Sequence, residues 1–156
     1  MWSKVAESGV NWQMFMGSYE HRLDGKGRIV MPAKFRPALG NSVVCTVGLD
    51  GCLAIYPLDE WERYLGKLRD LPFTKAQARA FMRTLLGAAE ELPVDSQGRI
   101  LISSRLRSYA SLTDAVTVNG VSDHVELWNT DKWNASNDDM LRDFTSLAEG
   151  VGDFGV

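Results

Sequence analysis

A short motif occurs twice in this chain, and the resulting internal repeat limits the possible folds more than any other feature of the sequence. The run DGKGRIVM at residues 24–31 is matched by DSQGRILI at residues 95–102, 71 positions later. A second pair, IYPLDEW at 55–61 and LWNTDKW at 127–133, follows at a shift of 72. Because both motifs recur in the same order, the chain is expected to contain two copies of one structural unit.

Both copies have the pattern of β-hairpins. Alternation of side-chain type over residues 19–23 leads into a glycine-containing turn at 24–28 and then into residues 29–31. This pattern is typical of two strands joined by a tight turn. The β-rich runs 43–47 and 52–56 flank a loop with two glycines and predict a second hairpin in the first copy.

Helices are expected between and after the hairpins. Pro32 opens a short one that runs to Leu39, because proline suits the first position of a helix, and Ser103 with Ser104 offers the N-cap of its counterpart. Two helices, from about Asp59 and from Thr74, link the copies, and a last one starts at Thr130. Four side chains on the apolar faces of these helices are expected in the core: Trp61, Phe81, Met82 and Trp133.

These elements divide the chain into five parts. Residues 1–13 are an N-terminal extension with no assigned structural role, 14–70 the first repeat, 71–90 a linking helix, 91–140 the second repeat, and 141–156 an acidic tail that is expected to fray. With 156 residues, 45% of them hydrophobic, the chain can bury a core of its own.

Charge is distributed unevenly along the chain. The formal net charge of −3 argues mildly against a nucleic-acid partner. Residues 17–36, however, hold five basic side chains against two acids, whereas residues 137–156 hold five acids against one arginine. The first segment is therefore a candidate DNA-binding patch, and its basic residues are Arg22, Lys26, Arg28, Lys34 and Arg36.

Other kinds of site have little support. No run approaches the roughly 18 apolar residues of a membrane helix. Cys45 and Cys52 lie seven apart without a nearby histidine pair, which argues against zinc or a disulfide and fits a reduced cytosolic setting. His21 and His124 are isolated, so each is expected to be structural. Because no catalytic motif occurs either, we expect no enzyme, no metal and no cofactor.

The repeated turn explains two of its own residue types structurally. Asp24 and Asp95 can each accept a hydrogen bond from the backbone two residues on. Gly27 and Gly98 can supply the positive φ that a tight turn requires. These four residues are therefore expected to shape the turn.

The arginine that ends each turn has two possible roles. It can pair with the aspartate across the loop, for under about 1 kcal/mol if exposed, or point outward to a phosphate or a base. Arg28 lies in the basic segment, whereas Glu90 and Glu91 precede Arg99. We therefore expect the nucleic-acid role mainly for Arg28.

Several of these runs together resemble the MraZ family of bacterial transcriptional regulators. The match extends from about Met14 to Met140 and includes both turns, MFMG at 14–17, MPAKFR at 31–36 and GLDGCL at 48–53. The resemblance implies the AbrB-like swapped-hairpin group. The expected fold is then α+β and β-rich, a swapped-hairpin barrel made from two internal repeats in one chain, with flanking helices.

The resemblance also implies which residues contact DNA. The AbrB-like contact positions and their basic neighbours give the candidate set His21, Arg22, Lys26, Arg28, Lys34 and Arg36. The second copy departs from this pattern, with no basic residue at Leu92 or Pro93 and with Ser103 in place of the proline. Its weaker candidates are Arg99, Arg105 and Arg107.

The family's role supplies the functional expectation. The resemblance implies a cytoplasmic, nucleoid-associated regulator that forms a homo-oligomeric closed ring and binds short direct repeats in promoter DNA. Its implied action is repression of the cell-division and cell-wall gene cluster, its own gene included, without any membrane partner. An alternative stays open: the basic patch is only solvated, and the chain is a ring-forming interaction protein that regulates a partner protein without reading DNA.

Overall fold

Strands and helices alternate along the chain, and the computed structural model describes residues 4–5, 10–11 and 14–155. The strands are β1 Lys4–Val5, β2 Val10–Asn11, β3 Phe15–Arg22, β4 Arg28–Val30, β5 Ser42–Val47, β6 Leu53–Pro57, β7 Glu90–Pro93, β8 Arg99–Leu101, β9 Ala115–Ser122 and β10 His124–Asn129. The α-helices are α1 Arg36–Leu39, α2 Leu58–Leu68, α3 Ala76–Ala88, α4 Ser104–Ala110, α5 Thr130–Arg142 and α6 Phe144–Gly150. Short 3-10 turns occupy Ala33–Phe35, Leu49–Gly51 and Gly152–Phe154.

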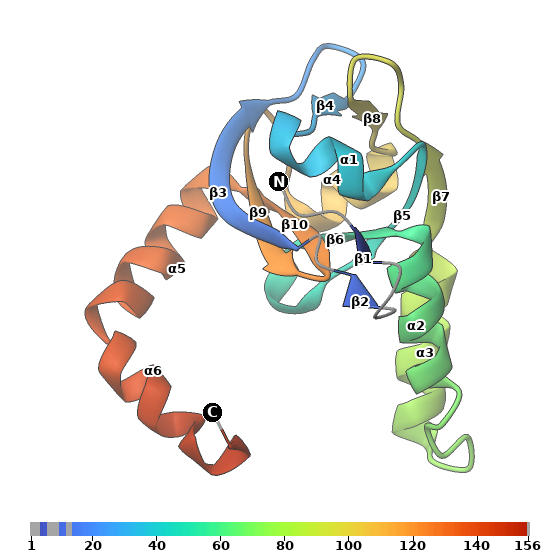
Figure 1. The fold of residues 1–156 in the computed structure, drawn as a ribbon, viewed down its shortest axis with the longest axis vertical. Helices are drawn as coiled ribbons and strands as arrows, with labels where there is room; N and C mark the ends of the chain where they lie inside the picture. Colours follow the sequence, from blue (N-terminus) through green and yellow to red (C-terminus); the bar gives the residue numbers. More distant parts are fainter. Residues whose placement is uncertain (1–3, 6–9, 12–13, 156) are drawn as a thin grey trace.

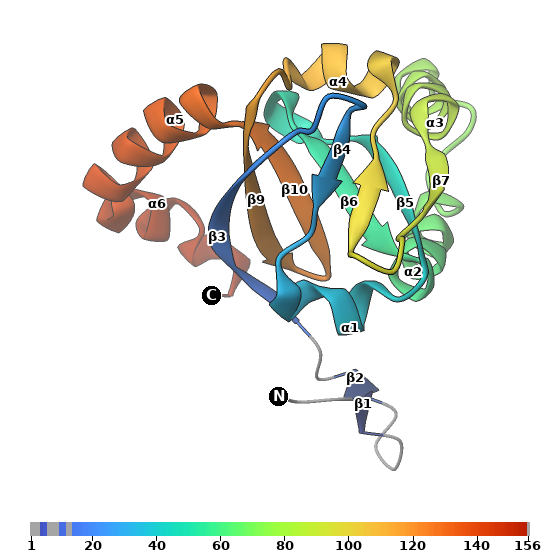
Figure 2. The ribbon, with the colours of Figure 1, turned by 90° about the horizontal axis from the view of Figure 1, so that it is seen from above.

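The main sheet interleaves strands of the two repeats. Its order is β3-β9-β10-β6-β5-β7, with every neighbouring pair antiparallel. β3 of the first repeat pairs with β9 of the second, and β7 of the second pairs with β5 of the first. The small pair β4–β8 lies over one face of this sheet (Figures 1 and 2). Neither repeat therefore completes the sheet alone.

The sheet does not close into the expected barrel. Its edges are β3 and β7, and no backbone pairing joins them within the described residues. After β3 the chain turns at Asp24 and continues as β4, which pairs with β8 rather than with β3 or another strand of the main sheet. The hairpin expected across the turn at 24–28 is therefore wrong, because each of its strands pairs with a strand of the other repeat. The closed barrel is thus wrong, whereas the α+β class with a mostly antiparallel sheet built from two repeats is confirmed.

The core fills the space between the β4–β8 pair and the main sheet. From β4–β8 and the residues that follow these strands, Ile29, Met31, Ile100 and Ile102 point inward and are fully buried. They belong to one cluster with Val43, Cys45, Leu53, Ile55, Val116, Val118, Val125 and Leu127 of the sheet. Burying each large side chain contributes about 1.5–3 kcal/mol. The cluster therefore holds the β4–β8 pair, and the turn that precedes each strand, firmly on the sheet.

Two helical arms stand on opposite sides of the sheet: α2 with α3, and α5 with α6 (Figure 2). Trp61 of α2 is buried, and Trp133 of α5 is half-buried against Trp128, with ring centroids 5.4 Å apart. Met82 of α3 is half-buried. The expected core position is wrong for Phe81, which is 39% exposed because it lines a hollow beside the loop 48–50 rather than a packed layer.

The helix ends follow some local sequence signals and differ from others. Ser103 caps α4 by accepting a hydrogen bond from the backbone N–H of Leu106, as its residue type predicts. α3 starts at Ala76, after Lys75 rather than at the expected cap Thr74. Within the tail that was expected to fray, residues 144–150 form the helix α6.

Candidate nucleic-acid interface

The first turn is closed by hydrogen bonds from one aspartate. Asp24 Oδ1 accepts the backbone N–H groups of Lys26 and Arg28, each at 2.9 Å, and its carbonyl oxygen accepts that of Gly27 at 3.1 Å. Gly27 has a φ of +86°, in the region that favours glycine. The backbone N–H of Arg28 is the main cause that lowers the pKa of Asp24 to about 2.

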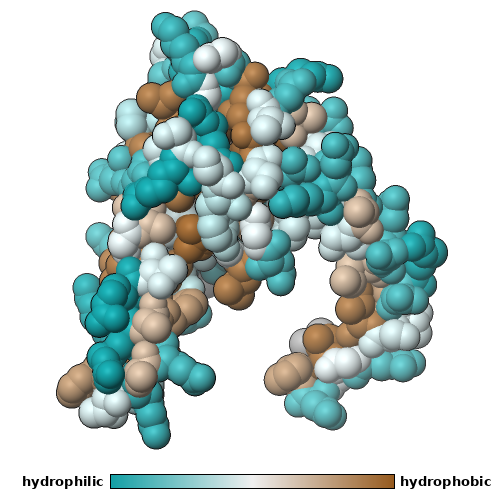
Figure 3. Space-filling view, turned by 180° about the vertical axis from the view of Figure 1, so that it is seen from behind, coloured by the Kyte–Doolittle hydropathy of each residue, from teal (hydrophilic) through white to brown (hydrophobic). Residues whose placement is uncertain are grey.

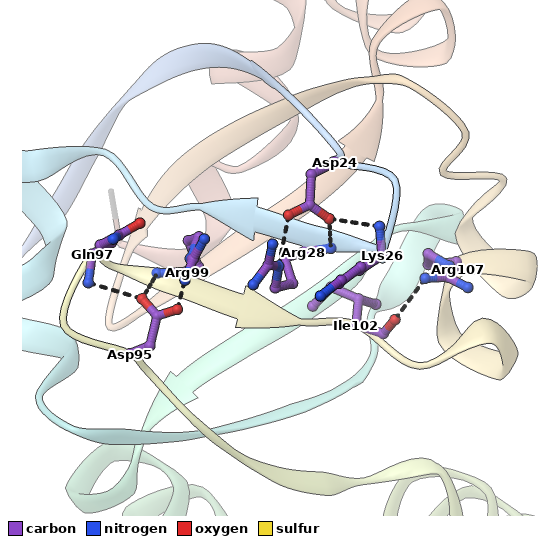
Figure 4. Close-up of polar contacts among 8 residues, drawn as sticks. All are labelled: Asp24, Lys26, Arg28, Asp95, Gln97, Arg99, Ile102 and Arg107. Atoms are coloured by element: carbon purple, nitrogen blue, oxygen red, sulfur yellow. Dashed lines mark hydrogen bonds and ion pairs between the residues drawn. The ribbon is translucent and has the colours of Figure 1, made fainter.

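The second turn repeats this geometry (Figure 4). Asp95 Oδ1 accepts the backbone N–H groups of Gln97 and Arg99, each at 2.9 Å. Gly98 has a φ of +78°. The backbone N–H of Arg99 lowers the pKa of Asp95 below its ordinary value. The repeated motif therefore encodes one turn, built twice.

Each turn also fixes its arginine through a single nitrogen. Arg28 Nε donates to Asp24 Oδ2 at 2.6 Å, and Arg99 Nε donates to Asp95 Oδ2 at 2.7 Å. Within the part of the chain that the structure describes, neither arginine donates from its terminal Nη nitrogens to another residue. The ion pair and the outward contact are thus compatible, because the pair holds the guanidinium while its two terminal NH₂ groups remain to contact a phosphate or a base.

The two arginines share the outer face of the β4–β8 pair. In this pair Ile29 lies opposite Ile100, and both point into the core. Side chains alternate along a strand, so Arg28 and Arg99 point away from it, as do their cross-strand neighbours Leu101 and Val30. Leu101 is 53% exposed. The face therefore carries two anchored guanidinium groups with apolar side chains beside them.

The halves are joined through the turns themselves. The backbone N–H of Met31 donates to the carbonyl of Gly98 at 2.8 Å, and that of Ile102 donates to the carbonyl of Gly27 at 3.0 Å. Each turn glycine thus accepts a bond from the residue that follows the other half's strand. Neither turn is completed by its own half alone.

A second pair of arginines is exchanged between the halves. Arg36 donates from Nε to the carbonyl of Met31 at 3.1 Å, and Arg107 donates from Nη1 to that of Ile102 at 3.2 Å. An added Cβ on Gly98 would lie 2.3 Å from Arg36 Nε, and one on Gly27 would lie 1.5 Å from Arg107 Nη1. Arg36 therefore lies on the second turn and Arg107 on the first.

This exchange corrects the expected grouping of the candidates. Sequence proximity placed Arg36 in the basic setting of the first turn, because both lie within residues 17–36. Arg107 was a weak candidate, yet it covers the first turn. The repeat could have signalled their equivalence, since they lie 71 positions apart. It could not have shown which turn each one covers.

The remaining first-half candidates differ in how exposed and how free of ion pairs their side chains are. Lys26 in the turn and Lys34 on the 3-10 turn after Pro32 are exposed. Arg22, also exposed, donates to Asp114 at 2.7 Å, whereas His21 on β3 is half-buried. Lys26 and Lys34 are therefore the more available cations of this half.

Arg105 is committed to contacts within its own half. Its Nη2 lies 2.9 Å from Glu90 Oε2, and it also donates to the carbonyls of Gly87 and Ala88. Its equivalent in the first repeat is Lys34, 71 positions earlier, which is exposed. The second half therefore presents less free positive charge than the first.

Titratable groups elsewhere form a structural cluster. His124 Nδ1 lies 2.7 Å from Asp123 Oδ1, and its ring stacks on Tyr56 with centroids 4.9 Å apart. Burial lowers the pKa of His124, but its interactions with the acceptor carboxylates of Glu126 and Asp123 favour the protonated ring and outweigh burial, so the pKa is raised. The structural role expected for His124 is confirmed.

The thiols and the charged groups show no reactive or metal-binding arrangement in the described ranges. Cys45 and Cys52 are free and buried, and burial raises the pKa of Cys52 to about 12. Residues 4–5, 10–11 and 14–155 include no cluster of histidine, cysteine or acidic side chains suited to a metal ion. Over the same ranges, every helix is too short or too polar to cross a lipid bilayer.

Comparison with known proteins gives concordant matches over both repeats. The family model described as "MraZ protein, putative antitoxin-like" matches residues 14–84 and 85–149. Proteins named Transcriptional regulator MraZ are similar over most of the chain. The one from Natranaerobius thermophilus is 46% identical over 92% of this chain and 100% of its own. The one from Ligilactobacillus salivarius is 48% identical over 90% of this chain and 99% of its own.

Proposed function

This chain belongs to the MraZ family, and from that premise we propose that it regulates transcription by binding double-stranded DNA directly. The proposed contact surface, here called the arginine face, consists of Arg28, Arg99 and the flanking Arg36 and Arg107. Lys26 extends it at the first turn, and Lys34, between Met31 and Arg36, extends it on the side of the second turn. Non-enzymatic action fits the family, whose named relatives are transcriptional regulators.

One observation carries the proposal: Arg28 and Arg99 are held outward from the same strand pair through Nε alone. A guanidinium fixed in this way loses little further freedom when its terminal nitrogens bind a phosphate or the O6 and N7 of guanine. The exposed Leu101 beside them can contact a thymine methyl group. The face thus offers both kinds of contact that base reading uses.

The first half is proposed to contribute more than the second. Its Lys26 corresponds to Gln97, and its free Lys34 corresponds to Arg105, which is bound to Glu90. His21 and Arg22 correspond to Leu92 and Pro93. Phosphate contacts scale with the number of available cations, so the half that contains Lys26 and Lys34 binds the backbone more strongly.

We further propose the assembly and target that the family resemblance implies. Copies of the swapped-hairpin unit form a closed ring, and several arginine faces on one ring bind short direct repeats in a promoter. Linking sites in this way raises affinity by about 10²–10⁴ over a single contact, which offsets the net charge of −3. The proposed target is the cell-division and cell-wall gene cluster, its own gene included, with repression and nucleoid association as the result.

A gel shift with the DNA upstream of the chain's own gene tests the contact surface. Arg28→Ala is expected to weaken binding about tenfold or more, as for loss of one bidentate base contact, and Arg99→Ala less. Both losses are expected to shrink the salt dependence of binding, measured at two salt concentrations. Lys132→Ala, on α5 and outside both the arginine face and residues 138–153, is the matched control.

The alternative function, an interaction protein that regulates a partner protein without reading DNA, predicts a different result. If the basic side chains are only solvated, and the chain regulates a partner protein, then wild type, Arg28→Ala and Arg99→Ala bind the promoter equally or not at all. That result would reject the arginine face as a DNA contact.

A further inference from the structure

The α5–α6 arm carries an apolar contact with the sheet near its start and a series of apolar side chains farther along that is exposed. Trp133 packs on Trp128 of the sheet. Beyond the polar Ser136 and Asn137, apolar residues recur from Met140 at alternating steps of four and three residues, a spacing that gathers them on one side of the arm. Its members beyond the sheet are Met140, Phe144, Leu147, Val151 and Phe154, all exposed. Figure 3 shows hydrophobic atoms along the side of this arm that faces the gap between the two arms.

Nothing within the described chain covers this end of the arm. Every residue from Asp138 to Gly155 is exposed. A helix as short as α6, seven residues, is not stable in water by itself. An apolar stripe that lies past its own sheet therefore implies a surface on which it docks.

The arm also carries a strong charge. Residues 138–153 hold five acids and one basic residue, Arg142, a net charge of −4. The partner surface must then be apolar in the middle and basic at its edges.

The far end of the other arm has this chemistry. Between α2 and α3 lies a groove of about 510 Å³ whose apolar lining includes Leu71, Phe73, Met82 and Leu86. Arg69, Arg79 and Arg83 line it as well. Residues 67–83 hold five basic side chains and one acid, Asp70, a net charge of +4. Phe73 is 79% exposed.

We propose that the α5–α6 arm of one copy docks into the α2–α3 groove of a second copy. The stripe from Met140 to Phe154 fills the apolar floor, and the acids of residues 138–153 face the three arginines. The two arms of one chain stand on opposite sides of its sheet (Figure 2), so the contact joins different chains. This assignment rests on the proposed self-association and names the surfaces that carry it.

The contact is head-to-tail, because a tail binds a groove and not another tail. Such a heterologous contact leaves one unused tail and one unused groove on any open oligomer. It therefore propagates until it closes on itself. It also leaves the arginine face of every copy uncovered, since β4–β8 lies on the opposite face of the sheet from the gap between the arms (Figure 1).

Two exposed phenylalanines allow each surface to be broken separately. Phe144→Ser removes the tail contact and Phe73→Ser the groove contact; both side chains are well exposed, so neither change disturbs the core. Leu49→Ser, on the 3-10 turn after β5 and equally exposed, is the matched control. Mass is measured by light scattering coupled to size exclusion at low salt.

Mixing the two variants is the decisive step. Wild type and Leu49→Ser are expected as one large species, and each phenylalanine variant alone as monomer. A mixture of the two has one intact tail and one intact groove per pair, so it is expected to give a dimer and nothing larger. A monomeric wild type, unchanged mass in either variant, or a mixture that stays monomeric would overturn the proposal. Since no DNA is present, its failure is independent of the arginine face.

Discussion

The two turns have the same geometry in different surroundings. Asp24 and Asp95 accept the same pair of backbone N–H groups at 2.9 Å and hold the following arginine at 2.6 and 2.7 Å. Lys26 and a free Lys34 belong to the first half, and Gln97 and an engaged Arg105 to the second. The shared residues build the turn, and the residues that differ decide how much charge each half presents.

The largest effect is expected from the residues that the turns share. Gly27→Ala and Gly98→Ala force a positive φ on alanine, and the new Cβ meets Arg107 or Arg36. A strained backbone of this kind lowers the free energy of unfolding by about 1–3 kcal/mol. Denaturant unfolding should therefore show similar losses for both variants.

The cause of that loss can be separated. Adding Arg107→Ala to Gly27→Ala removes the side chain that the Cβ would meet, while the backbone strain stays. We expect the double variant to recover little, because the arginine end is flexible. Full recovery would show that the clash, and not φ, controls the turn.

A smaller effect is expected from exchanging the charges that distinguish the turns. Lys26→Gln makes the first turn like the second and should weaken DNA binding several-fold, while Gln97→Lys should strengthen it. Each change should alter the slope of log affinity against log salt by about one. Binding titrations over a salt series measure both. Equal slopes in all three proteins would place residues 26 and 97 outside the DNA contact.

The smallest effect is expected on the pH dependence of folding stability. The pKa of Asp24 is lowered to about 2 from 3.8, mainly by the backbone N–H of Arg28, and that of Asp95 is also lowered. A carboxylate with a lowered folded-state pKa stabilises the fold above its unfolded value and loses this contribution as the pH falls toward 2. Asp24→Asn should flatten the fall in stability between about pH 4 and 2, and Asp95→Asn should flatten it less. Thermal unfolding across this pH range measures the change in stability. Parallel curves of stability against pH for wild type and Asp24→Asn would contradict the stabilising role of the Asp24 carboxylate.

Sequence reasoning reached what depends on local chemistry. The repeat, the hairpin of β5 and β6, the serine cap of α4 and the glycine positions of the turns all follow from residue type and spacing. These features involve residues close together in the chain, where propensity and hydrogen bonding decide the outcome.

Features set by contacts between residues distant in the sequence could not be inferred. The exchange of Arg36 and Arg107 depends on the antiparallel pairing of β4 with β8, which brings the end of each strand to the turn of the other half. Arg105 is basic in the sequence, but its charge is engaged by Glu90, 15 positions away. Phe81 lies on an apolar helical stripe, yet that stripe borders a hollow. In each case the deciding neighbour is distant in the sequence.

The pairing of β3 with β9 has a consequence for how the protein is made. Phe15 lies opposite Ser122, and Arg22 opposite Ala115, so the first long strand finds its partner only about a hundred residues later. Synthesis proceeds at about 5–20 residues per second, so β3 waits about 5–20 s for that partner. During this interval β4 also lacks β8, and Gly27 lacks the N–H of Ile102. The two halves therefore reach the native state together, at the end of translation.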